Sequence, residues 1–140
     1  MQKKLIYLLL AFMLCASFLA MQPAAATTQD KIKTMIIIDH EYYTHNFGIS
    51  WWLATETYLI DVNKGSHLNH QVLRYELYNP EGVLCEVQKH KTDELWYEDD
   101  VCAEALFEGD FPGEYWALKV FYDGNDIYEP CQKTFRFSTS

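Results

Sequence analysis

The stretch from Gly109 to Phe137 constrains the fold most, because it combines turn signals with a period-two pattern of apolar residues. Phe111–Gly113 predicts a corner, since proline fixes its own φ and glycine admits conformations closed to other residues. From Trp116 to Tyr122 every second side chain is large and apolar, which indicates a strand. Asp123-Gly124 favours a two-residue type I′ turn, so we expect a hairpin in which Cys131 lies opposite Trp116.

Strand signals recur at short spacing along the rest of the chain. The turn residues Asn79–Gly82 join two alternating segments into a second expected hairpin. Its expected core-facing residues are Leu73, Tyr75, Leu77, Val83, Cys85 and Val87. The predicted strands are 35–38, 48–60, 71–78, 83–89, 95–97 with 101–107, 116–122, and a return strand ending at 137. About seven strands without a convincing helix predict an all-β fold, a single antiparallel β-sandwich.

The N-terminus has the pattern of a secretory signal peptide. Lys3 and Lys4 precede an apolar run that is shorter than the ~20 residues of a membrane span, and small residues follow at 24–26. An uncleaved anchor is the alternative. We therefore expect a signal peptide (1–26), a flexible N-terminal arm (27–33) and one β-sandwich domain (34–140). The expected location is secreted, periplasmic or at the cell envelope, with no membrane span after cleavage.

The charge balance narrows the possible partners. The formal net charge is −9, and cleavage of the signal peptide removes two of the eleven cations. Such an acidic chain repels nucleic acid and anionic membranes, so neither is an expected partner. It suits cationic partners or divalent ions, although acidity also serves solubility alone.

The second half of the chain resembles the immunoglobulin-like β-sandwich modules of secreted bacterial proteins. The resemblance rests on 112–116, on 120–125, on the closing Phe135–Phe137 and on the turn Asn79–Gly82. It implies binding or scaffolding, although a fold alone does not decide function. It also implies that Tyr115 forms a tyrosine corner, hydrogen-bonding back across the turn. Ala117 stands where antibody domains have a cysteine, so the chain is not of the antibody type.

The expected mature chain has three cysteines: Cys85, Cys102 and Cys131. Export permits disulfides. If the strand after Cys85 turns near 92–93, Cys85 and Cys102 become diagonal neighbours, so this pair is the predicted disulfide. A pair that includes Cys131, or no disulfide, are the alternatives.

Some polar residues are of types that bind metal ions, but no set of them forms a complete metal or catalytic site. The spacing of His67 and His70 can hold zinc on a loop, and 99–100 and 123–126 carry oxygen ligands suited to calcium. Neither set has enough further ligands at a recognisable spacing. The sequence has no G-x-S-x-G, H-E-x-x-H or phosphate-loop motif. We predict no catalytic residue, no metal and no cofactor.

Aromatic residues are in surplus, at 16% of the chain. Adjacent pairs such as Trp51 and Trp52 point to opposite faces of a strand, so part of the aromatic surface should be exposed. Exposed aromatics mark binding faces, although aromatic pairs on an outer face can also cover each other. The candidate binding residues are Trp51, Trp52, Trp96 and Tyr115.

These patterns predict a secreted, non-enzymatic β-sandwich that contacts an unidentified protein or glycan at the cell envelope. A protein-interaction or structural module is the leading interpretation. The alternatives are a carbohydrate-binding module that uses exposed tryptophan and tyrosine, and a secreted protease inhibitor.

Overall fold

The computed structural model describes residues 29–45, 50–94 and 100–138. The chain divides into two units, Met1–Asp30 and Lys31–Ser140, and every described strand lies in the second unit. The strands are β1 (Thr34–His45), β2 (Ser50–Asp61), β3 (Ser66–His67), β4 (Val72–Tyr78), β5 (Leu84–Lys91), β6 (Asp93–Glu94), β7 (Val101–Gly109), β8 (Trp116–Tyr122) and β9 (Cys131–Phe137). No helix in the described ranges is long and apolar enough to cross a membrane.

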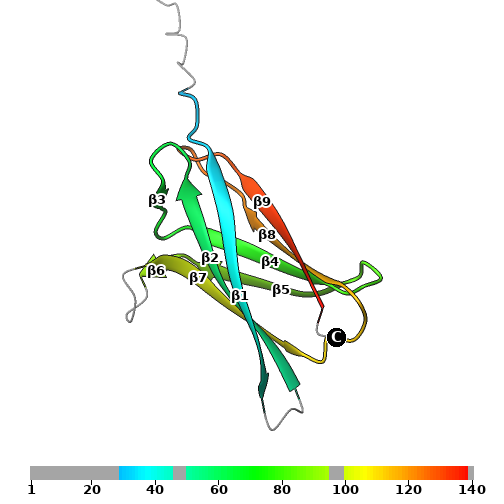
Figure 1. The fold of residues 1–140 in the computed structure, drawn as a ribbon. Coiled ribbons are helices and arrows are strands. Elements are labelled where there is room, and N and C mark those ends of the chain that lie inside the picture. Colours follow the sequence, from blue (N-terminus) through cyan, green and yellow to red (C-terminus); the bar gives the residue numbers. More distant parts are fainter. Residues whose placement is uncertain (1–28, 46–49, 95–99, 139–140) are drawn as a thin grey trace, which may run out of the picture. The chain divides into compact units, whose positions relative to one another are not determined.

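The strands form two antiparallel sheets, as the sequence predicts. Sheet 1 has the order β1-β2-β7-β6, with the short β3 added to β2, and sheet 2 has the order β5-β4-β8-β9. Figure 1 shows the sheets as two layers. Two of the nine described strands have only two residues, so the seven longer ones match the expected number. The all-β antiparallel sandwich is confirmed.

The core lies between the inner faces of the two sheets. Leu73, Tyr75 and Leu77 are buried on β4, as their alternation predicts, and so are the inward residues of β8 and β7. The core residues with no exposed surface are Leu53, Leu59, Leu73, Tyr75, Ala103, Phe107, Leu118 and Val120. One connected apolar cluster takes residues from both sheets, so the layers are held together by hydrophobic burial.

The β1–β2 hairpin is longer than the sequence pattern indicates. The pattern predicts a short strand at 35–38 and a polar connection from Asp39 onward, whereas β1 continues to His45 and pairs with β2 along its whole length. Asp39 and Glu41 fit a strand because both lie on the face of sheet 1 that is turned to solvent.

The β8–β9 hairpin is present, but its predicted tight turn and register are wrong. Tyr122 pairs with Cys131 and Trp116 with Phe137, so eight residues connect the strands. Asn125 explains the larger loop: its side-chain oxygen accepts hydrogen bonds from the backbone N–H groups of residues 127 and 128. The loop is also tied to Ile32, whose N–H donates to the carbonyl of residue 127.

The inward face of β5 is the opposite of the predicted one. The alternation predicts Val83, Cys85 and Val87 in the core, yet all three are exposed. Glu86, Gln88 and His90 lie opposite the buried residues of β4 instead and share their face. A register shift between Leu77 and Tyr78 interrupts the β4–β5 pairing close to the turn. Beyond this shift, the residues of β5 point to the face opposite to the one that the alternation from Val83 predicts.

Both open sides of the sandwich are bridged by contacts between strands of the two sheets. On one side the His40 and Phe135 rings lie 4.1 Å apart, joining β1 to β9. On the other side the Gln88 side-chain amide donates to the Leu106 carbonyl at 2.8 Å, joining β5 to β7. Exposed strand edges invite pairing with other chains, and such contacts limit it.

Candidate functional site

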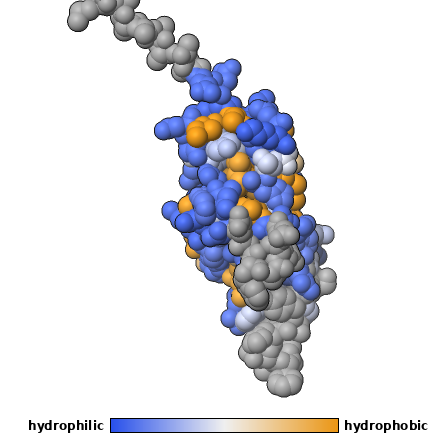
Figure 2. Space-filling view, turned by 90° about the vertical axis from the view of Figure 1, so that its left-hand side faces the viewer, coloured by the Kyte–Doolittle hydropathy of each residue, from blue (hydrophilic) through white to orange (hydrophobic). Residues whose placement is uncertain are grey.

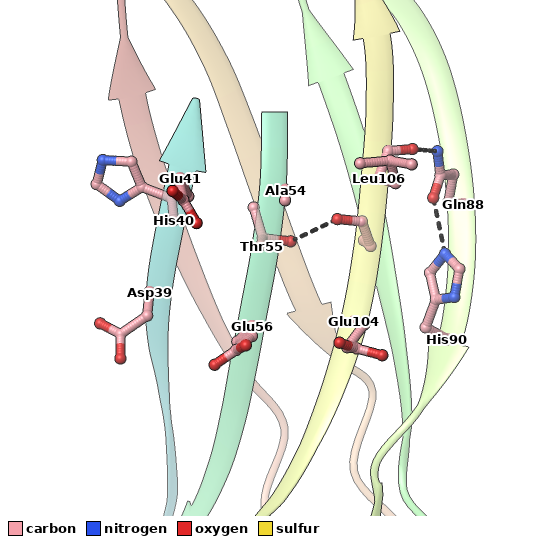
Figure 3. A pocket seen from close by; sticks show the side chains of 11 residues that line it. Asp39, His40, Glu41, Ala54, Thr55, Glu56, Gln88, His90, Glu104 and Leu106 are labelled. Carbon is pink, nitrogen blue, oxygen red and sulfur yellow. Dashed lines mark hydrogen bonds between the residues drawn. The ribbon is translucent and has the colours of Figure 1, made fainter. Parts of the chain in front are cut away.

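The outer face of sheet 1 carries a row of directly opposed carboxylates. Asp39 pairs with Glu56, and Glu56 pairs with Glu104, so the three side chains lie level on β1, β2 and β7 (Figure 3). Like charges in directly opposed positions destabilise a sheet. The row therefore costs folding free energy, and a cationic partner would offset that cost.

Two further carboxylates extend this surface, which we call the acidic face. Its anionic residues on the described strands are Asp39, Glu41, Glu56, Glu104 and Glu108. No lysine or arginine occupies an outward position of β1, β2 or β7 among the described residues. The sequence shows the net charge but not this face, because the carboxylates come from three distant segments and only the strand register brings them together.

A hollow of about 590 Å³ is lined by residues of β1, β2, β5 and β7, among them carboxylates of the acidic face. Asp39, Glu41, Glu56 and Glu104 line it together with polar groups of β5, among them Gln88 and His90 (Figure 3). Leu106 also lines the hollow and is 42% exposed. The site thus offers anionic oxygens around an apolar contact, which suits a cationic side chain with an aliphatic stem.

Two titratable groups near the hollow have shifted pKa values. Tyr58 donates a hydrogen bond to the Glu56 carboxylate at 3.0 Å. Removal from water and this carboxylate raise the pKa of Tyr58, so its hydroxyl stays protonated and keeps donating. Burial lowers the pKa of His90, which favours the neutral imidazole; one ring nitrogen lies 2.7 Å from the Gln88 side-chain oxygen.

The outer face of sheet 2 has the opposite charge. Its cations on the strands are Arg74, Lys89, Lys91, Lys119 and Arg136, and Glu76 is the one acidic residue among its described strand positions. We call this surface the basic face. The two faces belong to different sheets and lie on opposite sides of the core.

Cations cover the aromatic rings of the basic face. The Arg74 guanidinium lies 4.3 Å from the centre of the Phe121 ring, and the Lys119 ammonium lies 4.4 Å from that of Tyr78. Both are cation–π contacts. Part of the aromatic surplus on sheet 2 is therefore explained by surface packing.

The candidate aromatic residues do not form one surface. Trp51 packs against the core, and Trp52 projects from the other face of β2. Trp96 lies outside the described residues. Tyr115 is 62% exposed beside a hollow of about 210 Å³. The expected tyrosine-corner bond is replaced by one from Trp116, whose indole N–H donates to the Pro112 carbonyl at 2.8 Å.

The predicted disulfide between Cys85 and Cys102 is not formed. Cys85 is exposed at the start of β5 in sheet 2. Cys102 is buried on the outer side of sheet 1, beside Tyr58 and Ile60. The two residues lie on opposite sides of the sandwich, because β5 joins β4 rather than pairing with the strand that follows it. No disulfide links the cysteines of the described segments.

The polar residues considered as metal ligands have other contacts. His67 Nδ1 lies 2.7 Å from an Asp100 carboxylate oxygen, and the Asn125 side chain shapes the β8–β9 loop. Asp99 lies outside the described residues. Within 29–45, 50–94 and 100–138, no group of three or more histidine, cysteine or acidic side chains is arranged to hold a metal ion.

Comparison with known proteins finds weak likeness to solved structures and no matching family. No protein-family model matches the chain, and no curated protein matches it. Among solved structures, a β-glucuronidase of Bifidobacterium dentium, complexed with coumarin-3-O-glucuronide, is similar with a TM-score of 0.45 and 10% sequence identity. The match covers 75% of this chain but 18% of the β-glucuronidase chain, so this chain spans less than a fifth of that protein.

Proposed function

We propose that the protein is a secreted or periplasmic, non-enzymatic, immunoglobulin-like β-sandwich that acts through protein–protein contact at the cell envelope. The observation that carries the proposal is the acidic face, where four of the five carboxylates line a hollow of about 590 Å³ with no outward lysine or arginine on the described strands. Opposed charges that destabilise the free sheet favour a bound cationic surface.

The strand order supports the immunoglobulin-like part of the proposal. Such sandwiches place their first, second, fifth and fourth strands in one sheet and the third, sixth and seventh in the other. The order β1-β2-β7-β6 corresponds to the first set, with β6 reduced to two residues. The order β4-β8-β9 corresponds to the second, and β5 is the additional edge strand found in some members.

Affinity capture with matched charge variants tests the proposed function. The mature protein is immobilised and exposed to native envelope extract of the source cells at low and moderate salt. We expect a specific protein to bind the wild type and to be lost from Asp39→Lys/Glu108→Lys, whose substitutions lie on the exposed acidic face. Glu81→Lys/Asp126→Lys changes the charge equally in exposed loops and should retain the partner.

The proposed function fails if the correctly folded wild type binds no protein, or if both variants bind it equally. Circular dichroism and thermal melting establish that each variant is folded. Fractionation of source cells gives a separate check on location: the mature protein should lie outside the cytoplasm and lack residues 1–26.

Carbohydrate binding is the second candidate, favoured by the smaller hollow. Tyr115 borders it together with Tyr78, Trp116 and Arg136, which combines aromatic rings with a hydrogen-bond donor. A glycan array probed with wild type and Tyr115→Ala tests this role. Binding that is lost in the variant supports it, and a blank array with the folded wild type rejects it.

A further inference from the structure

The two outer faces carry complementary charge on one molecule. The acidic face has five carboxylates and no cation at its described strand positions, while the basic face has five cations and one carboxylate. Alternation within the strands enforces this division, because every second residue of a strand points to the same face. The net charge of the whole chain does not reveal this separation of charge between the two faces.

Both faces also present apolar side chains among the charges. On the acidic face Ile37 is 39% exposed and Leu106 is 42% exposed. On the basic face Val72 is 54% exposed and Val87 is 49% exposed. Figure 2 shows one side of the molecule, where hydrophilic surface surrounds smaller apolar patches. Specific interfaces combine apolar contacts with complementary charge. Here the acidic face supplies the carboxylates, the basic face supplies the cations, and both supply apolar side chains.

We propose that the partner of the acidic face is the basic face of a second copy of this chain. The inference rests on the proposed interaction function and names the partner of the same surface. Cations at the exposed edge of sheet 2, Lys89 and Lys91, are suited to the hollow lined by Asp39, Glu56 and Glu104. Each molecule uses two different faces, so the contact is heterologous and leaves one face of each type open for further copies.

Sedimentation of the mature protein at several concentrations tests the proposal. At low ionic strength we expect the average mass to rise with protein concentration, and we expect the rise to weaken at 1 M salt, where the Debye length falls to about 3 Å. Two variants each disrupt one face: Asp39→Lys/Glu108→Lys replaces two carboxylates of the acidic face by cations, and Lys89→Glu/Lys91→Glu replaces two cations of the basic face by carboxylates. Each should weaken self-association about tenfold or more.

A mixture of the two variants gives the decisive test. The first variant keeps the natural basic face and the second keeps the natural acidic face, so an equimolar mixture should associate more strongly than either variant does alone. Glu81→Lys/Asp126→Lys and Lys64→Glu/Lys133→Glu carry matched charge changes at exposed positions away from both faces and should associate like the wild type. Circular dichroism identifies any variant that does not fold.

Three results would overturn the inference: a wild type that stays monomeric at every concentration, variants that associate as well as the wild type, or a mixture that does not associate. Failure here is distinct from failure of the proposed function. A monomeric wild type that still captures an envelope protein through the acidic face rejects the second copy as partner and leaves the interaction function standing.

Discussion

At the scale of single residues, the cysteines differ sharply in their access to solvent. Cys85 is exposed, Cys131 is half-buried and Cys102 is 2% exposed. Burial also raises the pKa of the Cys131 thiol, which lowers its thiolate fraction at neutral pH. We expect maleimide to label Cys85 first, Cys131 more slowly and Cys102 after unfolding in urea, as measured by peptide mass spectrometry. Native labelling of Cys102 at the rate of Cys85 would contradict the structure.

We expect the folding stability of the protein to depend on pH through His90. Its pKa is lowered by burial from the ordinary value of 6.5, so the unfolded chain binds the proton more readily than the folded one. Stability therefore rises with pH in the window below 6.5 and falls as the medium is acidified through that window. His90→Gln should flatten this part of the profile. Urea unfolding between about pH 5 and 8 measures the effect, with His70→Gln as an exposed control.

At the scale of elements, the loop between β8 and β9 depends on Gly124. This residue has φ +75°, and a Cβ would lie 2.8 Å from the Pro130 nitrogen and from the Tyr128 oxygen. Gly65 has a similar φ of +67°, but a Cβ there would have no atom within 4 Å. Gly65→Ala should cost about 1 kcal/mol, from φ alone. Gly124→Ala should cost at least about 1 kcal/mol more, because the backbone must also shift.

Urea denaturation of the two glycine variants measures this difference. Equal losses in unfolding free energy would show that the loop adjusts freely around residue 124. A larger loss for Gly124→Ala, with reduced amide protection at Ile32, would agree with the hydrogen bonds between that residue and the loop.

Local patterns predict individual strands well and their mutual placement less well. The buried alternation of Leu73, Tyr75 and Leu77 needs no partner to be recognised, and it is confirmed. The face of β5 depends on its pairing with β4 across a register shift, so the apolar alternation at Val83, Cys85 and Val87 indicates the wrong face. The acidic face depends on three strands at once, which a local pattern does not contain.

At the scale of the whole molecule, Tyr75 joins the two sheets. It is fully buried on β4, its ring lies 6.3 Å from that of Phe107 on β7, and its hydroxyl lies 3.4 Å from the Ala103 carbonyl oxygen, to which it donates. Tyr75→Ala should lower the free energy of unfolding by about 3–5 kcal/mol, since it leaves a cavity between the layers. Tyr75→Phe removes the hydroxyl alone and should cost about 0.5–1.5 kcal/mol.

Equilibrium unfolding followed by both tryptophan fluorescence and far-ultraviolet circular dichroism measures these losses. The two signals should shift together in Tyr75→Ala, because one apolar cluster spans both sheets. Separate transitions would mean that the sheets unfold independently.

The hydrogen bonds at Ile32 also have a mechanical consequence. Its N–H donates to the residue 127 carbonyl and its own carbonyl accepts from the Glu129 N–H, both at 2.8 Å, forming a parallel bridge to Tyr128. A force applied to the chain ahead of Lys31 reaches these two bonds before it reaches the β1–β2 ladder. The bridge therefore bears tension before the β1–β2 ladder does when the chain is pulled from that end.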